Sequence, residues 1–86
     1  MMLPTIHNNG TSRAELLAGY VEAIEALDEA IAALRRAAPN GRDYYPQSPQ
    51  AYPQARDEHL AHITALDAIR QDLNILADHA AWGNNP

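Results

Sequence analysis

The chain has 86 residues, no cysteine and no lysine, and a formal net charge of −5 at neutral pH. We expect a single domain spanning 1–86, which buries only about 60–65% of its unfolded surface and therefore has a thin margin of stability. The lack of cysteine excludes disulfides and thiolate metal sites, and the acidic balance disfavours duplex nucleic acid. No apolar run reaches the roughly 20 residues of a membrane span. We expect a soluble cytoplasmic protein without membrane or duplex nucleic-acid partners.

An extended N-terminal arm is expected over 1–10, and its apolar residues could lie across a neighbouring subunit. A first helix is expected over about 12–38. Ser12 and Glu15 have capping-box spacing, and Pro39 pushes its predecessor out of helical geometry. Apolar residues then recur at alternating steps of three and four, the spacing of a heptad seam: Leu17, Tyr20, Ile24, Leu27, Ile31 and Leu34.

A bend rich in tyrosine and proline follows over 39–48, and a second helix is expected over about 49–81. Its start is either Ser48 followed by Pro49, or a point near Pro53. Early steps of three in its apolar stripe predict a change of register against the first helix. The stripe comprises Leu60, Ile63, Leu66, Ile69 or Arg70, Leu73, Leu76 and Ala80. A glycine stop and a frayed tail are expected over 82–86.

These elements predict an all-α fold, an antiparallel two-helix hairpin with helices of about 25 residues, each roughly 38 Å long. One shared seam cannot cover all the apolar residues, among them those at positions 16, 20, 21, 24, 69 and 75. We therefore expect the hairpin to complete its core by homo-oligomerisation. A dimeric four-helix bundle is the simplest closure, and a trimer-based or hexameric assembly comes next.

Catalysis has little support in this composition. Both serines, Ser12 and Ser48, are better explained as helix caps, and the usual cysteine and lysine nucleophiles are absent. We expect no enzyme and no cofactor. His59 and His62 lie three residues apart near Glu58. Three interpretations of this pair are open: zinc ligands, spacers that flank the seam, or a mild pH-sensitive patch. No HExxH or other metal motif accompanies them, so we expect no metal site.

The bend carries the richest group of chemical side chains. Residues 35–56 have a local charge of +3, all of the positive charge from arginine, between segments of −4 on either side. Asn40–Gly41 predicts a turn with positive φ. Arginine beside tyrosine suits stacking on a base while a guanidinium holds phosphate, and the start of a helix favours anions. The predicted ligand-binding residues are Asn40, Arg42, Tyr44, Tyr45, Arg56 and Arg36.

Two other interpretations of the bend stay open. It is a structural lid over the helix ends, in which Arg42 pairs with a nearby carboxylate: Asp43, Asp57 or Glu58. Alternatively, it is a tip that docks onto another protein, since tyrosine and arginine are favoured at protein interfaces.

The run NGRDYYPQ after an alanine-rich helix, with IHNNGTS near the start and DEHL opening the second helix, resembles a group of small phage and prophage proteins over most of 3–77. In size and architecture the chain is also similar to the helical-hairpin sponges, anti-CBASS and anti-Thoeris proteins that sequester cyclic nucleotide signals of bacterial immunity. Those sponges are small non-catalytic oligomers that bind ligand at subunit junctions. This chain differs from them in its long bend and its lack of lysine, and no binding residue is carried over.

These resemblances imply a phage-encoded, non-enzymatic binding protein of the host cell cytoplasm that sequesters a cyclic nucleotide. The alternative is a phage accessory protein, or an inhibitor that docks onto a host defence protein through the bend.

Overall fold

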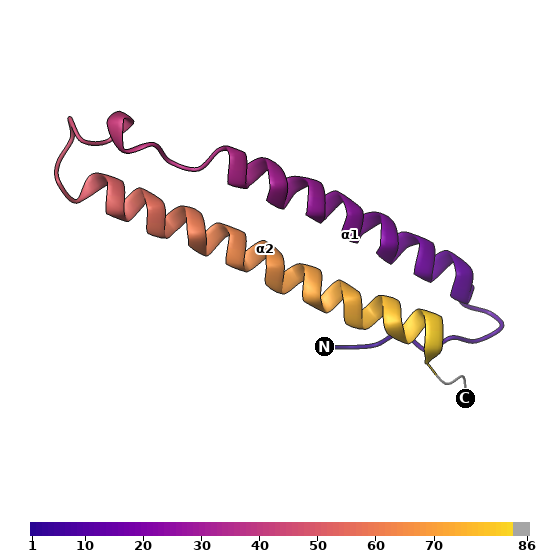
Figure 1. Cartoon of the computed structure of the whole chain (residues 1–86). Helices are drawn as coiled ribbons and strands as arrows, with labels where there is room; N and C mark the ends of the chain where they lie inside the picture. The colour runs from indigo at the N-terminus through magenta and orange to yellow at the C-terminus, as the bar shows by residue number, and fades with distance from the viewer. Residues whose placement is uncertain (84–86) are drawn as a thin grey trace.

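The computed structural model describes residues 1–83, which form two long helices and one short one. Helix α1 spans Arg13–Arg36, the 3-10 helix η1 spans Gly41–Asp43, and α2 spans Ala51–Trp82. The two long helices lie side by side and antiparallel (Figure 1), and the described part of the chain contains no strand. The expected all-α hairpin is confirmed.

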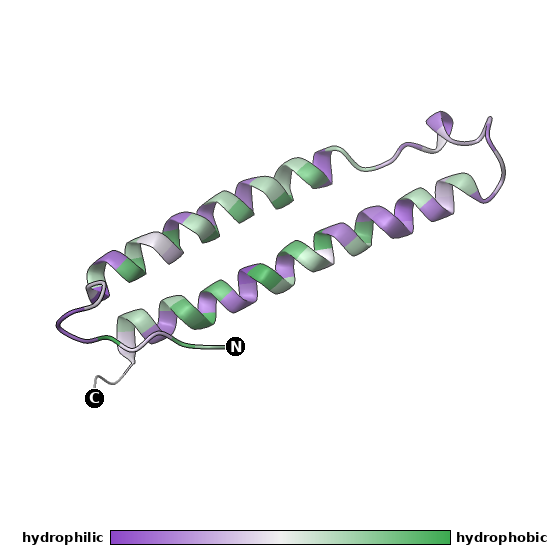
Figure 2. Ribbon diagram, turned by 180° about the vertical axis from the view of Figure 1, so that it is seen from behind, coloured by the Kyte–Doolittle hydropathy of each residue, from purple (hydrophilic) through white to green (hydrophobic). Residues whose placement is uncertain are grey.

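The hairpin is a rod with very little core. Its extents are 61 × 20 × 17 Å and its radius of gyration is 18.7 Å, against roughly 12 Å for a compact chain of this length. Apolar residues occur along the whole of both helices (Figure 2), yet no large side chain among residues 1–83 is fully buried. The buried apolar residues are Ile6, Ile31, Ala77 and Ala80. A single helix–helix contact therefore leaves much of the apolar surface uncovered.

Helix α1 begins as the capping pattern predicts. The Ser12 hydroxyl accepts a hydrogen bond from the Glu15 amide at 3.1 Å, which satisfies one of the free amides of the first turn. At the other end the Ala37 amide is shared between the Ala33 and Leu34 carbonyls. Pro39 follows closely, and the helix ends two residues before the predicted position.

Helix α2 begins at Ala51, two residues before Pro53, and its N-terminal cap residue is Gln50, so the predicted cap at Ser48 is wrong. Ser48 is not the cap; its carbonyl instead accepts from the Ala51 amide at 3.3 Å in a turn before the helix. Pro53 falls in the first helical turn, where an amide has no intrahelical acceptor, and this position tolerates proline.

The predicted glycine stop is confirmed, since α2 ends at Trp82 and Gly83 is its C-terminal cap residue. The Gly83 amide donates to the His79 carbonyl at 2.7 Å. A β-carbon at Gly83 would lie only 2.6 Å from His79 Nδ1, so the close approach requires glycine. Residues 84–86 of the predicted frayed tail lie outside the described residues.

The seam of α2 is more regular than its apolar residues alone predict. Partly or fully buried residues recur at steps of four and three: His59, Ile63, Leu66, Arg70, Leu73, Ala77 and Ala80. Leu60 and Ile69 are instead 54% and 50% exposed. With His59 and Arg70 counted as seam positions, α2 has an unbroken heptad repeat from His59 to Ala80. The predicted change of register between the two helices is therefore wrong. Long polar side chains can occupy such positions with their apolar stems.

The N-terminal arm lies against the C-terminal end of α2 in the same chain (Figure 1). Ile6 is buried, and His79 Nε2 donates to the Pro4 carbonyl at 2.6 Å. The Arg13 guanidinium donates to the carbonyls of Ala80 at 2.7 Å and Gly83 at 2.8 Å. A cation on the last carbonyls of a helix is favourable because they carry the negative end of its dipole.

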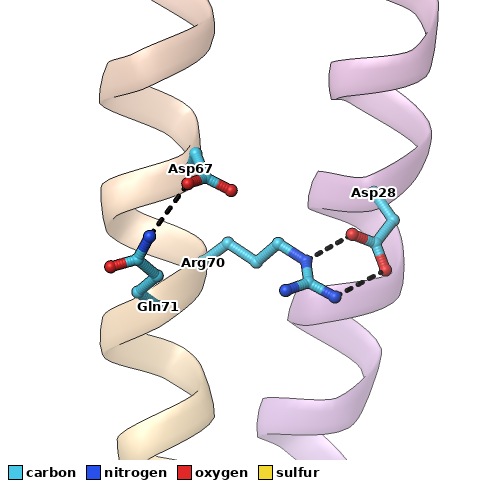
Figure 3. A network of polar contacts seen from close by, with 4 residues as sticks. All are labelled: Asp28, Asp67, Arg70 and Gln71. Atoms are coloured by element: carbon cyan, nitrogen blue, oxygen red, sulfur yellow. Dashed lines mark hydrogen bonds and ion pairs between the residues drawn. The ribbon is translucent and has the colours of Figure 1, made fainter.

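An ion pair joins the middles of the two helices (Figure 3). Arg70 Nε donates to Asp28 Oδ1, and Arg70 Nη2 lies 3.4 Å from Asp28 Oδ2. The hydrogen bond that Arg70 donates to Asp28 is the main cause of a raised pKa of Arg70, and the attraction of the Asp28 carboxylate adds to it. Because the pair is partly exposed, it contributes more to helix alignment than to stability. Neither long helix in the described chain has the length and apolar content that a membrane crossing requires.

Candidate functional site

The bend between α1 and α2 is locally folded. Asn40 Oδ1 accepts from the Arg42 amide at 3.1 Å and caps η1. Amides then donate to carbonyls three or four residues back at 2.9–3.0 Å: Asp43 to Asn40, Tyr44 and Tyr45 to Gly41, and Gln47 to Tyr44. These bonds all lie within the tip and hold its backbone in a defined shape.

The predicted turn with positive φ at Asn40–Gly41 is wrong, because no described residue has a positive φ. Gly41 instead opens η1, and it lies near the ring of Tyr52. A 3-10 turn and a left-handed turn both suit Asn-Gly, and only the surrounding chain decides between them.

Arg42 and Tyr45 are exposed at the tip, with 74% of the Tyr45 surface open to solvent. Within residues 1–83 the Arg42 side chain has no hydrogen bond or ion pair, so its predicted pairing with Asp43, Asp57 or Glu58 is wrong. That removes the basis for treating Arg42 as part of a structural lid.

Arg56 has structural partners of its own. Its Nε donates to Asp57 Oδ1 at 3.3 Å, and its guanidinium carbon lies 6.0 Å from the centre of the Tyr52 ring. This distance is at the limit of a cation–π contact. Arg36 lies in the last turn of α1 and is exposed.

An open pocket of about 160 Å³ lies between the bend and the first turns of α2. Its lining residues are Tyr44, Gln47, Ala51, Gln54, Ala55 and Glu58. Gln54 Nε2 donates to Glu58 Oε1 at 2.9 Å. Tyr44 is the one predicted ligand-binding residue in this lining; Asn40, Arg42, Tyr45, Arg56 and Arg36 are not part of it. The pocket therefore suits an uncharged hydrogen-bonding group better than a phosphate.

The sequence interpretation did not identify Gln47 or Gln54, and it named Glu58 only as a possible partner of Arg42 and a neighbour of the histidines. Helical spacing could have identified the members of the pocket on α2. Counted from Ala51, three further lining residues follow at steps of three, four and seven, and so share one face of α2: Gln54, Ala55 and Glu58. The position of the bend against this face could not be inferred from spacing.

The two histidines of α2 occupy different environments. His59 is half-buried in the seam, with its Nε2 atom buried and unpartnered within the described chain, whereas His62 is exposed. No group of three or more metal-ligating side chains occurs among residues 1–83.

Comparisons of the chain with protein-family models, with curated proteins and with solved structures give no match. The geometry of the bend is therefore the basis for assigning a function.

Proposed function

We propose that this chain is a non-enzymatic binding protein whose recognition surface is the bend, and that it docks onto another protein. The observation that carries the proposal is the exposure of Tyr45 beside Arg42, a cation without a side-chain partner in the described chain. Tyrosine and arginine supply much of the binding energy at protein interfaces. The backbone hydrogen bonds around η1 preorganise the tip, which reduces the entropy lost on binding.

Charge favours an acidic surface on the partner. Residues 35–56 carry +3 while the remainder of the chain is acidic. A positive tip on a negative rod orients the molecule as it approaches an acidic surface, which raises the association rate at low salt. The resemblance of NGRDYYPQ to phage proteins supports a partner in the host cell, such as a defence protein.

The test is affinity capture with the tagged chain, followed by binding measurements with the purified partner. Arg42→Ala and Tyr45→Ala should each weaken binding by about tenfold or more, the effect of losing an interface hot spot. Glu22→Ala, an exposed position on α1, is the matched control and should bind as wild type does. Unchanged binding by both tip variants would contradict docking through the bend.

Sequestration of a nucleotide is a second candidate, favoured by the pocket against Tyr44. Gln47 and Gln54 could bond the edge of a base stacked near the tyrosine. Its phosphate would have to reach arginines outside the pocket, because Glu58 in the lining repels an anion.

A thermal-shift screen against cyclic and linear nucleotides tests this candidate. A ligand present at 100 times its Kd stabilises the folded state by about 2.7 kcal/mol, which is a shift of roughly 10–20 °C for a domain of this size. Tyr44→Ala and Gln54→Ala should abolish that shift. If no nucleotide produces a shift, the sequestration candidate fails and docking onto a protein is the proposal that remains.

A further inference from the structure

The two sides of the hairpin differ in charge. On one side of the seam, α1 carries Glu25, Asp28 and Arg35, and α2 carries Asp67 and Asp78; Figure 3 shows Asp28 and Asp67 near Arg70. The exposed Val21 and Leu60 lie among these charged residues. We call this side the polar flank. The other side, the apolar flank, carries on α1 six residues without charge: Leu16, Gly19, Ala23, Ala26, Ala30 and Ala33. An antiparallel pair with one shared seam brings corresponding flanks of its helices to the same side.

The apolar flank of α2 bears larger residues. Ile69 is 50% exposed and Leu76 is half-buried, with Ala65 on the same side. The polar residues at these heptad positions are Glu58, His62, Asp72 and His79. The first three are exposed, whereas His79 is half-buried and bonds to the Pro4 carbonyl of the N-terminal arm. The flank therefore presents small side chains on α1 and bulky ones on α2.

Gly19 gives a separate indication that this flank is covered. A β-carbon at that position would meet nothing within 4 Å, so nothing in the described chain requires glycine there. Glycine is the least favourable residue in a helix interior apart from proline. Its usual advantage is to let another backbone approach closely, and the approaching chain is not part of this hairpin.

The chain exposes more surface than a compact monomer of its mass, and the excess is large enough to form one side of a dimer interface. The chain exposes 6253 Å², whereas a compact monomer of 9.4 kDa exposes roughly 5,000 Å². The excess, roughly 1,200 Å², is comparable with the about 800 Å² that each partner buries in a standard interface. A flank about 36 Å long, from the 24 residues of α1, and 20 Å wide provides such a footprint.

We propose that a second copy of this chain covers the apolar flank, in a dimer with its two-fold axis along the rod. This symmetry places α2 of each copy over α1 of the other. It also keeps every residue at the same height along the rod in both copies. The contacts of Asp28 with Arg70 and of Arg13 with Gly83 set those levels within a chain. By equal helical rise, Ile69 then lies level with Ala26 and Ala30, and Leu76 lies level with Gly19 and Ala23.

Each bulky residue thus meets a small-residue gap of the partner, and the two-fold axis repeats the fit. Ile69 and Leu76 are seven residues apart, as are Ala23 and Ala30, so both contacts keep heptad spacing. The result is a four-helix bundle with both bends at the same end. This inference is independent of what the bends bind.

The first experiment is the mass of the full chain in solution, by sedimentation equilibrium, across a range of protein concentrations. Wild type should have twice the 9.4 kDa chain mass. Ala26→Glu and Ile69→Glu, both at exposed positions of the apolar flank, should weaken the dimer by at least tenfold while the helical circular-dichroism signal persists. Ala32→Glu, an exposed alanine of the same helix on the polar flank, is the matched control and should remain dimeric.

A monomeric wild type, a trimer or hexamer, or a dimer insensitive to both apolar-flank variants would overturn the proposal. The relative direction of the two copies can be measured separately. Because the chain has no cysteine, a single introduced cysteine can be labelled specifically. A nitroxide on Asp43→Cys should give an intermolecular distance below about 40 Å, since neighbouring helices lie about 10 Å apart. A separation near the 61 Å length of the rod would place the bends at opposite ends and overturn the axial two-fold.

Discussion

The two ends of the hairpin are held by different kinds of contact. At the arm end, Ile6, Ala77 and Ala80 are buried, and Arg13 and His79 form hydrogen bonds to residues more than 65 positions away. At the bend end, the hydrogen bonds are local, Tyr45 is exposed, and His59 has a buried nitrogen without a partner in the described chain. Long-range contacts stabilise one end, while the local turns of the other leave Arg42 and Tyr45 exposed to solvent.

Among substitutions that test this difference between the two ends, the largest change in stability is expected in the N-terminal arm. Ile6→Ala removes the buried anchor of the N-terminal segment and should cost about 2 kcal/mol, at the low end of such truncations because the arm can detach. For a domain of this size that is a fall in Tm of roughly 8–16 °C, measured by calorimetry.

Leu3→Ala is the control for that prediction, since Leu3 lies in the same arm and is 43% exposed. It should leave Tm almost unchanged. Equal losses from the two substitutions would show that the arm is not anchored at Ile6 and would remove the contrast between the ends.

A smaller effect of opposite sign is expected near the bend. His59→Leu replaces a buried, unpartnered nitrogen by apolar atoms and should stabilise the fold by about 1 kcal/mol, or roughly 4–8 °C in Tm. His59→Gln keeps a polar group in the seam and should bring no such gain. A lower Tm for the leucine variant would mean that His59 has a polar partner after all, such as a bound water.

The smallest effect is expected from Arg70→Gln in the middle of the rod, because partly exposed ion pairs contribute little. The raised pKa of Arg70 means that the folded chain holds this proton more tightly than the unfolded chain does. Its stabilising contribution is therefore complete below the ordinary arginine range and is lost only in strong alkali. The difference in Tm between variant and wild type should be the same at pH 7 and pH 10, and smaller in 1 M salt.

A difference that changes between pH 7 and pH 10 would contradict this account of Arg70. A loss larger than that of Ile6→Ala would move the main stabilising contacts from the arm to the middle of the molecule.

Much of the fold was predictable from local patterns. The seam of α1, its Ser12 cap and the glycine stop of α2 all follow from spacing and residue type, and all three are confirmed. The errors arose where polar residues take structural positions. His59 occupies the α2 seam position for which the exposed Leu60 was predicted. Of the two predicted alternatives Ile69 and Arg70, Arg70 lies in the seam and Ile69 is exposed.

The candidate site was predicted less well. The bend was identified by its unusual composition. In the structure Arg42 and Tyr45 are exposed, and Tyr44 lines the pocket. Gln54 and Glu58 were not assigned to the site because they belong to the pocket only through the way the bend meets α2. Spacing identifies a helix face, but it does not identify what lies opposite that face.

The sequence by itself determined the two helices, the place of the bend and the shortage of core, because these depend on periodicity, on proline and on the amount of apolar surface. Only the tertiary structure decided that the N-terminal arm packs on its own chain, that Arg42 has no partner within residues 1–83, and that one flank of the hairpin carries fewer charged residues than the other. Those outcomes depend on which residues, distant in the chain, share an axial level and a side of the hairpin. The rotation of each helix about its axis sets that relation, and local propensity does not.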